Sequence, residues 1–123
     1  MVIIPAEYTA MVKALFKIDG FDTGANATLH AAVGISGEAG EILDVVKKTW
    51  AYNKPLDHEH LTEELGDLEF YLEALYQATG ISRTEALRRN RMKLAARYPA
   101  GVYSDADAQL RADKGGEDYD PVN

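Results

Sequence analysis

Gly37-Glu38-Ala39-Gly40-Glu41 is the first of two acidic stretches around which this chain is organised, and the second is Glu63-Glu64-Leu65-Gly66-Asp67. Each stretch lies in a segment with helical apolar periodicity, and residues three apart are neighbours on a helix surface. The acidic residues with this spacing are Glu38 and Glu41 in the first stretch, and Glu64 and Asp67 in the second. Each pair is therefore expected to share one helix face.

Two such pairs that faced each other would form a site with four carboxylates. Unit charges repel by roughly 4 kcal/mol per pair at about 4 Å when the effective dielectric is about 20, so a cation or protonation must relieve the repulsion. Hard oxygen ligands in a chain with no Cys and few His favour Mg²⁺ or Mn²⁺. Mg²⁺ typically joins one or two protein carboxylates to the phosphates of a substrate. The residues thus indicate a metal-dependent site for a nucleotide polyphosphate.

A single acidic pair is more often a solvated helix face or a partner in surface ion pairs. The metal hypothesis rests on the two pairs together. Both lie beside glycines on the inward-facing side of long predicted helices, where an uncompensated carboxylate is costly.

Composition narrows the class of protein. The chain has 123 residues and a formal net charge of −7. We expect one domain over residues 1–114, followed by a polar, flexible tail over 115–123. The negative charge argues against binding to nucleic-acid polymers, because phosphate-backbone affinity needs a basic surface. No stretch is apolar enough to span a bilayer and the N-terminus is too short for a signal peptide, so we expect a cytoplasmic protein without membrane contact.

The periodicity predicts an all-α fold, a bundle of four main helices plus a short C-terminal helix. The expected helices cover residues 5–18, 29–50, 58–79, 83–98 and 105–114, with a loop over 19–26. Asn26 or Thr28 is a candidate cap for the second helix. Gly80 should end the third helix, and Ser82 with Glu85 forms a capping-box pattern for the fourth. The run 1–4 is the only candidate strand.

The second helix carries an unusual set of glycines, Gly34, Gly37 and Gly40. Each costs roughly 1 kcal/mol relative to Ala in a helix interior. They lie along nearly one side, where they would let another helix or a ligand approach the backbone closely. Simple packing between helices is the other interpretation. The apolar stripe of this helix consists of Leu29, Val33, Ala39, Leu43, Val46 and Trp50.

A basic helix complements the acidic stretches. Between Arg83 and Arg97 there are five Arg and one Lys against a single Glu. Lys93 and Arg97 stand four apart, with Asn90 one turn earlier, so an ammonium, a guanidinium and an amide can converge on phosphate oxygens. The alternative is a solvated basic face.

Three other features have a mainly structural interpretation. Tyr71 follows Asp67 by one turn and can contact a substrate, although core packing is the commoner role for such a residue. Asp57-His58-Glu59-His60 lies at a predicted helix start, where acidic and polar residues suit the helix dipole. His30 is expected to be packed or partly exposed.

Three segments together resemble the MazG-like nucleoside triphosphate pyrophosphohydrolases, in the short single-domain form of bacteria and their phages. The segments are Gly34-Ile35-Ser36-Gly37-Glu38-Ala39-Gly40-Glu41, Glu63-Glu64-Leu65-Gly66-Asp67 and Asn90-Arg91-Met92-Lys93-Leu94-Ala95-Ala96-Arg97-Tyr98-Pro99. The similarity runs from about residue 29 to 114. Its most specific part is Glu-x-x-Glu followed by Glu-x-x-Asp.

The resemblance implies an all-α fold whose bundles are completed by subunit pairing, hence a homodimer or homotetramer. It implies Mg²⁺, with Mn²⁺ as a possible substitute, held by the catalytic carboxylates Glu38, Glu41, Glu64 and Asp67. Lys93 and Arg97 match phosphate-binding positions of the family. Lys48 falls where further substrate contacts can arise.

The expected reaction is hydrolysis of a (deoxy)nucleoside triphosphate to the monophosphate and pyrophosphate. A narrower deoxypyrimidine triphosphatase or a phosphoribosyl-ATP pyrophosphohydrolase fits the same residues. A non-catalytic helical protein that binds a metal or a basic partner through the acidic residues is the alternative from another class.

Overall fold

The computed structural model describes residues 4–16 and 24–114, and every regular element in them is helical. Their order is α1 (Ala6–Leu15), α2 (Gly24–Tyr52), α3 (His58–Thr79), α4 (Arg83–Arg97), α5 (Asp105–Leu110) and the short 3-10 helix η1 (Ala112–Lys114). The prediction of an all-α fold is confirmed. None of the helices in these ranges is long and apolar enough to cross a membrane.

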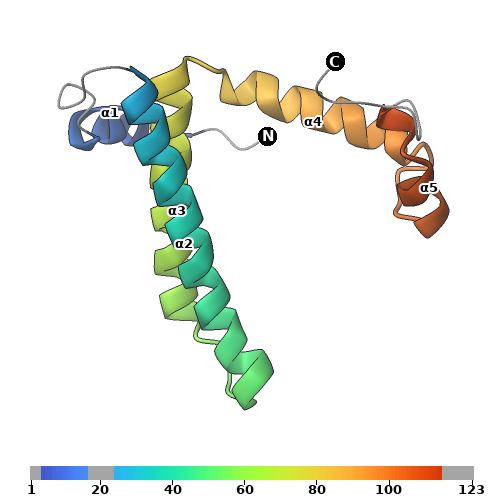
Figure 1. Ribbon diagram of the computed structural model, residues 1–123, viewed down its shortest axis with the longest axis horizontal. Helices are drawn as coiled ribbons and strands as arrows, with labels where there is room; N and C mark the ends of the chain where they lie inside the picture. Colours follow the sequence, from blue (N-terminus) through green and yellow to red (C-terminus); the bar gives the residue numbers. More distant parts are fainter. Residues whose placement is uncertain (1–3, 17–23, 115–123) are drawn as a thin grey trace. The chain divides into compact units, whose positions relative to one another are not determined.

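The chain divides into two compact units, Met1–Gly80 and Ile81–Asn123, which are described separately. In the first unit, α2 and α3 form a long helical hairpin, and α1 packs on α3 (Figure 1). In the second unit, α4 contacts both α5 and η1.

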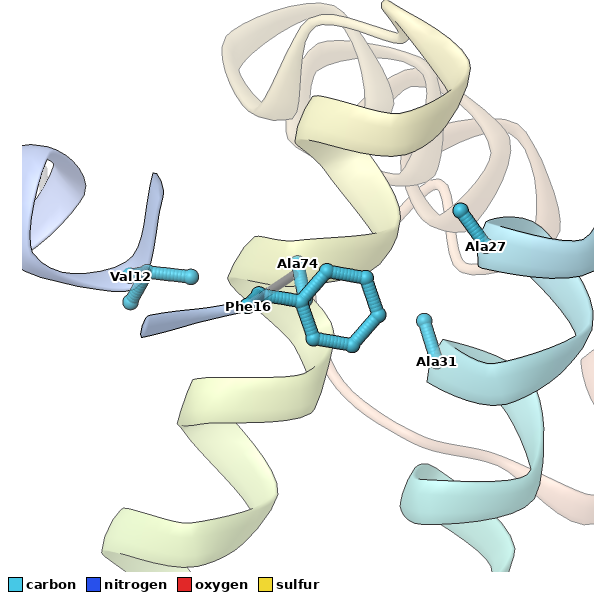
Figure 2. Close-up of a cluster of buried hydrophobic side chains, with 5 residues drawn as sticks. All are labelled: Val12, Phe16, Ala27, Ala31 and Ala74. Carbon is cyan, nitrogen blue, oxygen red and sulfur yellow. The ribbon is translucent and has the colours of Figure 1, made fainter. Parts of the chain in front are cut away.

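The core of the first unit consists of Val12, Phe16, Ala27, Ala31 and Ala74. Figure 2 shows the Phe16 ring between Ala74 of α3 and the two alanines of α2. Small residues at these three positions leave room for the ring between the helices. The core therefore joins the end of α1, the first turns of α2 and the last turns of α3.

The predicted boundaries of α3 are confirmed. Asp57 is its N-cap, and its side chain accepts a hydrogen bond from the His60 backbone N–H at 3.0 Å. Gly80 ends the helix with φ 73°, in the left-handed region that glycine adopts without strain. The start of α4 is confirmed as well, because the Ser82 hydroxyl accepts from the Glu85 backbone N–H at 3.2 Å.

Other predicted boundaries were wrong. α2 begins at Gly24, so residues 24–26 are helical rather than part of a loop, and neither Asn26 nor Thr28 is its cap. α1 ends at Leu15 and α4 at Arg97, each before its predicted end. The last predicted helix is broken at Arg111, whose φ of 51° separates α5 from η1. Three predicted features lie wholly or partly outside the described residues: the candidate strand 1–4 except for its last residue, the first part of the predicted loop, residues 19–23, and the tail 115–123.

Candidate metal centre

The hairpin of α2 and α3 places one acidic residue of each helix in the contact between them. Along α2 the buried and half-buried side chains recur every three or four positions, the period of one helix face. This row includes Ala27, Ala31, Gly34, Ile35, Glu38, Ile42, Val45 and Thr49. The corresponding row of α3 includes Leu61, Glu64, Leu68, Tyr71, Leu75 and Ala78. Glu38 and Glu64 therefore belong to rows that otherwise are mainly apolar.

Glu38, Glu64 and Asp67 form a carboxylate cluster. Each offers one oxygen, and these oxygens all lie within 4.8 Å of one another. The Glu64 side chain is only 12% exposed, Glu38 is half-buried and Asp67 faces solvent. The spacing predicts that acidic pairs from the two helices meet, and the structure brings three of these four residues together.

Glu41 has a different position from the other predicted ligands. It is exposed on α2 and is not one of the three residues whose oxygens gather within 4.8 Å. Its negative charge nevertheless contributes to raising the pKa of Glu38. A role for Glu41 as a fourth metal ligand stays a prediction.

The Glu38 carboxyl has a raised pKa. Its removal from water raises the pKa, a hydrogen bond with the Glu64 side chain raises it further, and the charges of Asp67, Glu64 and Glu41 add to the effect. All of these causes disfavour a third negative charge between the helices. A proton or a cation relieves them, and three hard oxygen donors suit a divalent ion such as Mg²⁺.

His60 approaches the cluster from the first turns of α3. Its Nε2 lies 3.0 Å from Oε1 of Glu64, one helical turn away. The segment 57–60 was predicted to be mainly a helix start, which the Asp57 cap confirms, and its contact with Glu64 was not predicted. The signal was present in the spacing, because residues four apart on a helix are neighbours.

Tyr71 packs inside the first unit. A Cβ added to Gly34 would lie 2.2 Å from Cδ1 of the Tyr71 ring, so the ring occupies the space that this glycine leaves open. The ring also meets Phe70 edge to face and lies near His30, and His30 in turn stacks on Phe16 with 4.9 Å between ring centroids. The expected packing roles of Tyr71 and His30 agree with these contacts, and a contact between Tyr71 and substrate stays a prediction.

The glycines of α2 differ in their surroundings. Gly34 meets the Tyr71 ring, which confirms a close approach of the neighbouring helix. Around Gly37 and Gly40, an added Cβ would meet none of the described residues within 4 Å. Packing among the residues that the structure describes therefore explains the first glycine but not the other two.

The predicted phosphate-binding residues Asn90, Lys93 and Arg97 lie on α4, in the second unit. Asn90 and Lys93 are exposed, and so is Lys48 on α2. Arg97 instead forms a forked ion pair with Asp113, with Nε 2.7 Å from Oδ1 and Nη2 3.0 Å from Oδ2. Helical periodicity does not predict this pair, because its members are 16 residues apart on different elements.

A family model described as the MazG nucleotide pyrophosphohydrolase domain matches residues 27–102 of this chain. The matched range contains the carboxylate cluster, His60 and the basic face of α4, whereas Asp113 lies beyond it. Comparisons with curated proteins and with solved structures gave no match.

Proposed function

Because the chain belongs to the MazG nucleotide pyrophosphohydrolase family, we propose that it hydrolyses nucleoside or deoxynucleoside triphosphates to the monophosphate and pyrophosphate. The observation that carries the proposal is the carboxylate cluster, with its oxygens within 4.8 Å of one another inside the matched range. Such a cluster is costly in a helical hairpin unless a cation or a proton relieves the repulsion.

The divalent ion, Mg²⁺ in this proposal, would be held by Glu38, Glu64 and Asp67, with Glu41 as a further ligand. Bound there, it supplies charge neutralisation for the phosphates and lowers the pKa of a water. The protein's own contribution is to hold these carboxylates on two packed helices, so that little rearrangement is needed on binding. A carboxylate of the set that is not fully used as a ligand would accept the proton of the attacking water.

We assign the binding of the triphosphate chain to Lys93, Arg97 and Asn90 of α4, with Lys48 of α2 as an additional cation. Their charges would stabilise the negative charge that develops on the leaving pyrophosphate. Arg97 would bind a phosphate oxygen beside its forked pair with Asp113, which uses Nε and Nη2 of the guanidinium. Tyr71, packed behind the cluster on α3, would act mainly by keeping α2 and α3 in place.

We further propose that the protein is a homodimer or a homotetramer. The apolar stripe predicted on α2 does not face α3: Leu29, Val33, Leu43 and Trp50 are each more than 60% exposed. A row of large apolar side chains on the outside of a helix is typical of an interface with another chain. Gly37 and Gly40, where an added Cβ would meet no described residue within 4 Å, would allow a second subunit or a substrate to approach α2.

The proposed reaction is tested by pyrophosphate release from a panel of NTPs and dNTPs, in Mg²⁺ and in EDTA. Glu64→Gln keeps the size of the side chain and removes its charge, and the matched control is Glu63→Gln, the exposed neighbour on α3. We expect Mg²⁺-dependent release by the wild type and by Glu63→Gln, and its loss in Glu64→Gln. Metal-dependent stabilisation without release from any nucleotide would favour a binding role instead, and release confined to one nucleotide would favour the narrower enzyme.

A further inference from the structure

His60 contacts the carboxylate cluster without belonging to it. Its ring reaches Glu64, whose side chain is 12% exposed, whereas the His60 side chain is 42% exposed. The backbone N–H of His60 is bound to the Asp57 side chain at the start of α3. The imidazole is therefore attached to a fixed point of the helix and spans the single turn that leads to the least exposed carboxylate of the set.

The contact also sets the direction of the hydrogen bond. An ionised carboxylate only accepts hydrogen bonds, so Nε2 of His60 must carry the hydrogen when Glu64 is charged. Glu64 then has its Oε1 engaged at 3.0 Å, and its side chain is also bonded to Glu38 of the cluster. Without this bond the carboxylate can turn about its last side-chain torsion, which is broad for Glu.

We propose that His60 is a positioning residue, which holds the Glu64 carboxylate in the orientation that the metal requires. The proposal rests on the proposed function and adds a residue that lies outside the four acidic positions. Hydrogen-bond partners of ligating carboxylates act in this way in other metal sites. The alternative interpretation of the contact between His60 and Glu64 is an ordinary surface pair. An example is Glu85 with Arg89 on α4, where both side chains are at least 38% exposed.

The test measures binding of Mn²⁺ alone, without nucleotide, to the full chain. His60→Ala removes the hydrogen bond, and His60→Gln retains an N–H donor of similar reach. The matched control is His58→Ala, because His58 lies two residues earlier and is exposed. Its ring nitrogen Nδ1 lies 3.1 Å from the Leu56 carbonyl oxygen, which is outside the carboxylate cluster. Circular dichroism of each metal-free variant establishes that the helices are intact.

We expect His60→Ala to bind Mn²⁺ roughly 10 to 100-fold more weakly than the wild type. His60→Gln should restore most of the affinity, and His58→Ala should leave it unchanged. In turnover with Mg²⁺, His60→Ala should raise the metal concentration needed for half-maximal rate more than it lowers the rate at saturating metal.

Two results overturn the proposal while leaving the proposed function intact: wild-type affinity in a folded His60→Ala variant, or equal losses in His60→Ala and His60→Gln. A different result would contradict the proposed function itself. That result is an affinity for Mn²⁺ in the wild type no greater than in Glu64→Gln, because the cluster would then not be the metal site.

Discussion

At the scale of single residues, Gly34 and Gly37 allow a direct comparison on one helix. A Cβ at Gly34 would lie 2.2 Å from the Tyr71 ring, which is held between Phe70 and His30, whereas a Cβ at Gly37 would meet nothing within 4 Å. We expect Gly34→Ala to lower the free energy of unfolding by about 1–3 kcal/mol, as overpacking does. Urea denaturation monitored by circular dichroism measures this loss.

Gly37→Ala is the control for this effect. Because an added Cβ at Gly37 would meet none of the described residues, this substitution should raise helix stability by about 0.5–1 kcal/mol, since Gly loses more backbone entropy than Ala. Equal losses in the two variants would show that the Tyr71 ring is not the reason for Gly34.

Glu38 makes the stability of the metal-free protein depend on pH. Desolvation, its bond with Glu64 and the surrounding carboxylates raise its pKa in the folded state above the usual 4.5. The folded state then binds the proton more tightly than the unfolded state, so stability falls as pH rises from 4.5 through the raised pKa. Glu38→Gln should lose this pH dependence and be more stable than the wild type at neutral pH in EDTA. Urea midpoints recorded across this range test it, and parallel curves for the two proteins would contradict it.

At the scale of elements, the start of α4 is stabilised by one acidic residue and two basic ones. Arg88 and Arg89 both bond to Glu85, and their hydrogen bonds lower its pKa to about 2. The folded state therefore releases the Glu85 proton more readily than the unfolded state. The stabilisation by these ion pairs is fully present above pH 4.5 and is lost as pH falls through about 2. We expect Glu85→Gln to reduce the helicity of α4 at neutral pH and to resemble the wild type in strong acid. Amide hydrogen exchange of residues 83–89 measures the difference, and high salt should reduce it.

The ends of the elements also show what the sequence could specify. The ends of α3 were predictable because Asp57 and Gly80 are a cap and a stop whose chemistry is local. The start of α2 was not, since Gly24 to Asn26 has the composition of a loop and is helical in the structure. The break at Arg111 was equally hidden, because a left-handed residue that is not Gly leaves no mark in the sequence.

Some features of the candidate site could also be predicted from the sequence, and others could not. Spacing by three predicted that Glu38, Glu64 and Asp67 lie near one another, because periodicity along a helix determines which residues share a face, but it grouped Glu41 with them and the cluster does not include Glu41. It did not identify Asp113 as the partner of Arg97, since contacts between distant segments depend on how the chain turns. Nor did it indicate that the apolar stripe of α2 points away from α3, because periodicity defines a face and not its partner.

The bond between Arg97 and Asp113 links α4 to η1. Asp113 has no exposed side-chain surface, and its carboxylate holds two nitrogens of the guanidinium. Asp113→Asn should loosen residues 112–114 while α4 stays helical. Faster hydrogen exchange confined to this turn is the expected result, and unchanged protection there would mean that other contacts hold η1 in place.

At the scale of the whole molecule, the outward apolar face of α2 determines how the protein is expected to assemble. Burying a side chain such as Leu43, now 65% exposed, is worth about 1.5–3 kcal/mol. We therefore expect the wild type to sediment as a dimer or tetramer, and Leu43→Glu to shift it toward the monomer because a charge would be buried there. Leu110→Glu on α5 is a matched control, since Leu110 is 64% exposed but lies outside the α2 face. Analytical ultracentrifugation distinguishes the outcomes. A monomeric wild type would contradict the proposed interface. Dissociation by Leu110→Glu alone would indicate that the interface lies in the second unit.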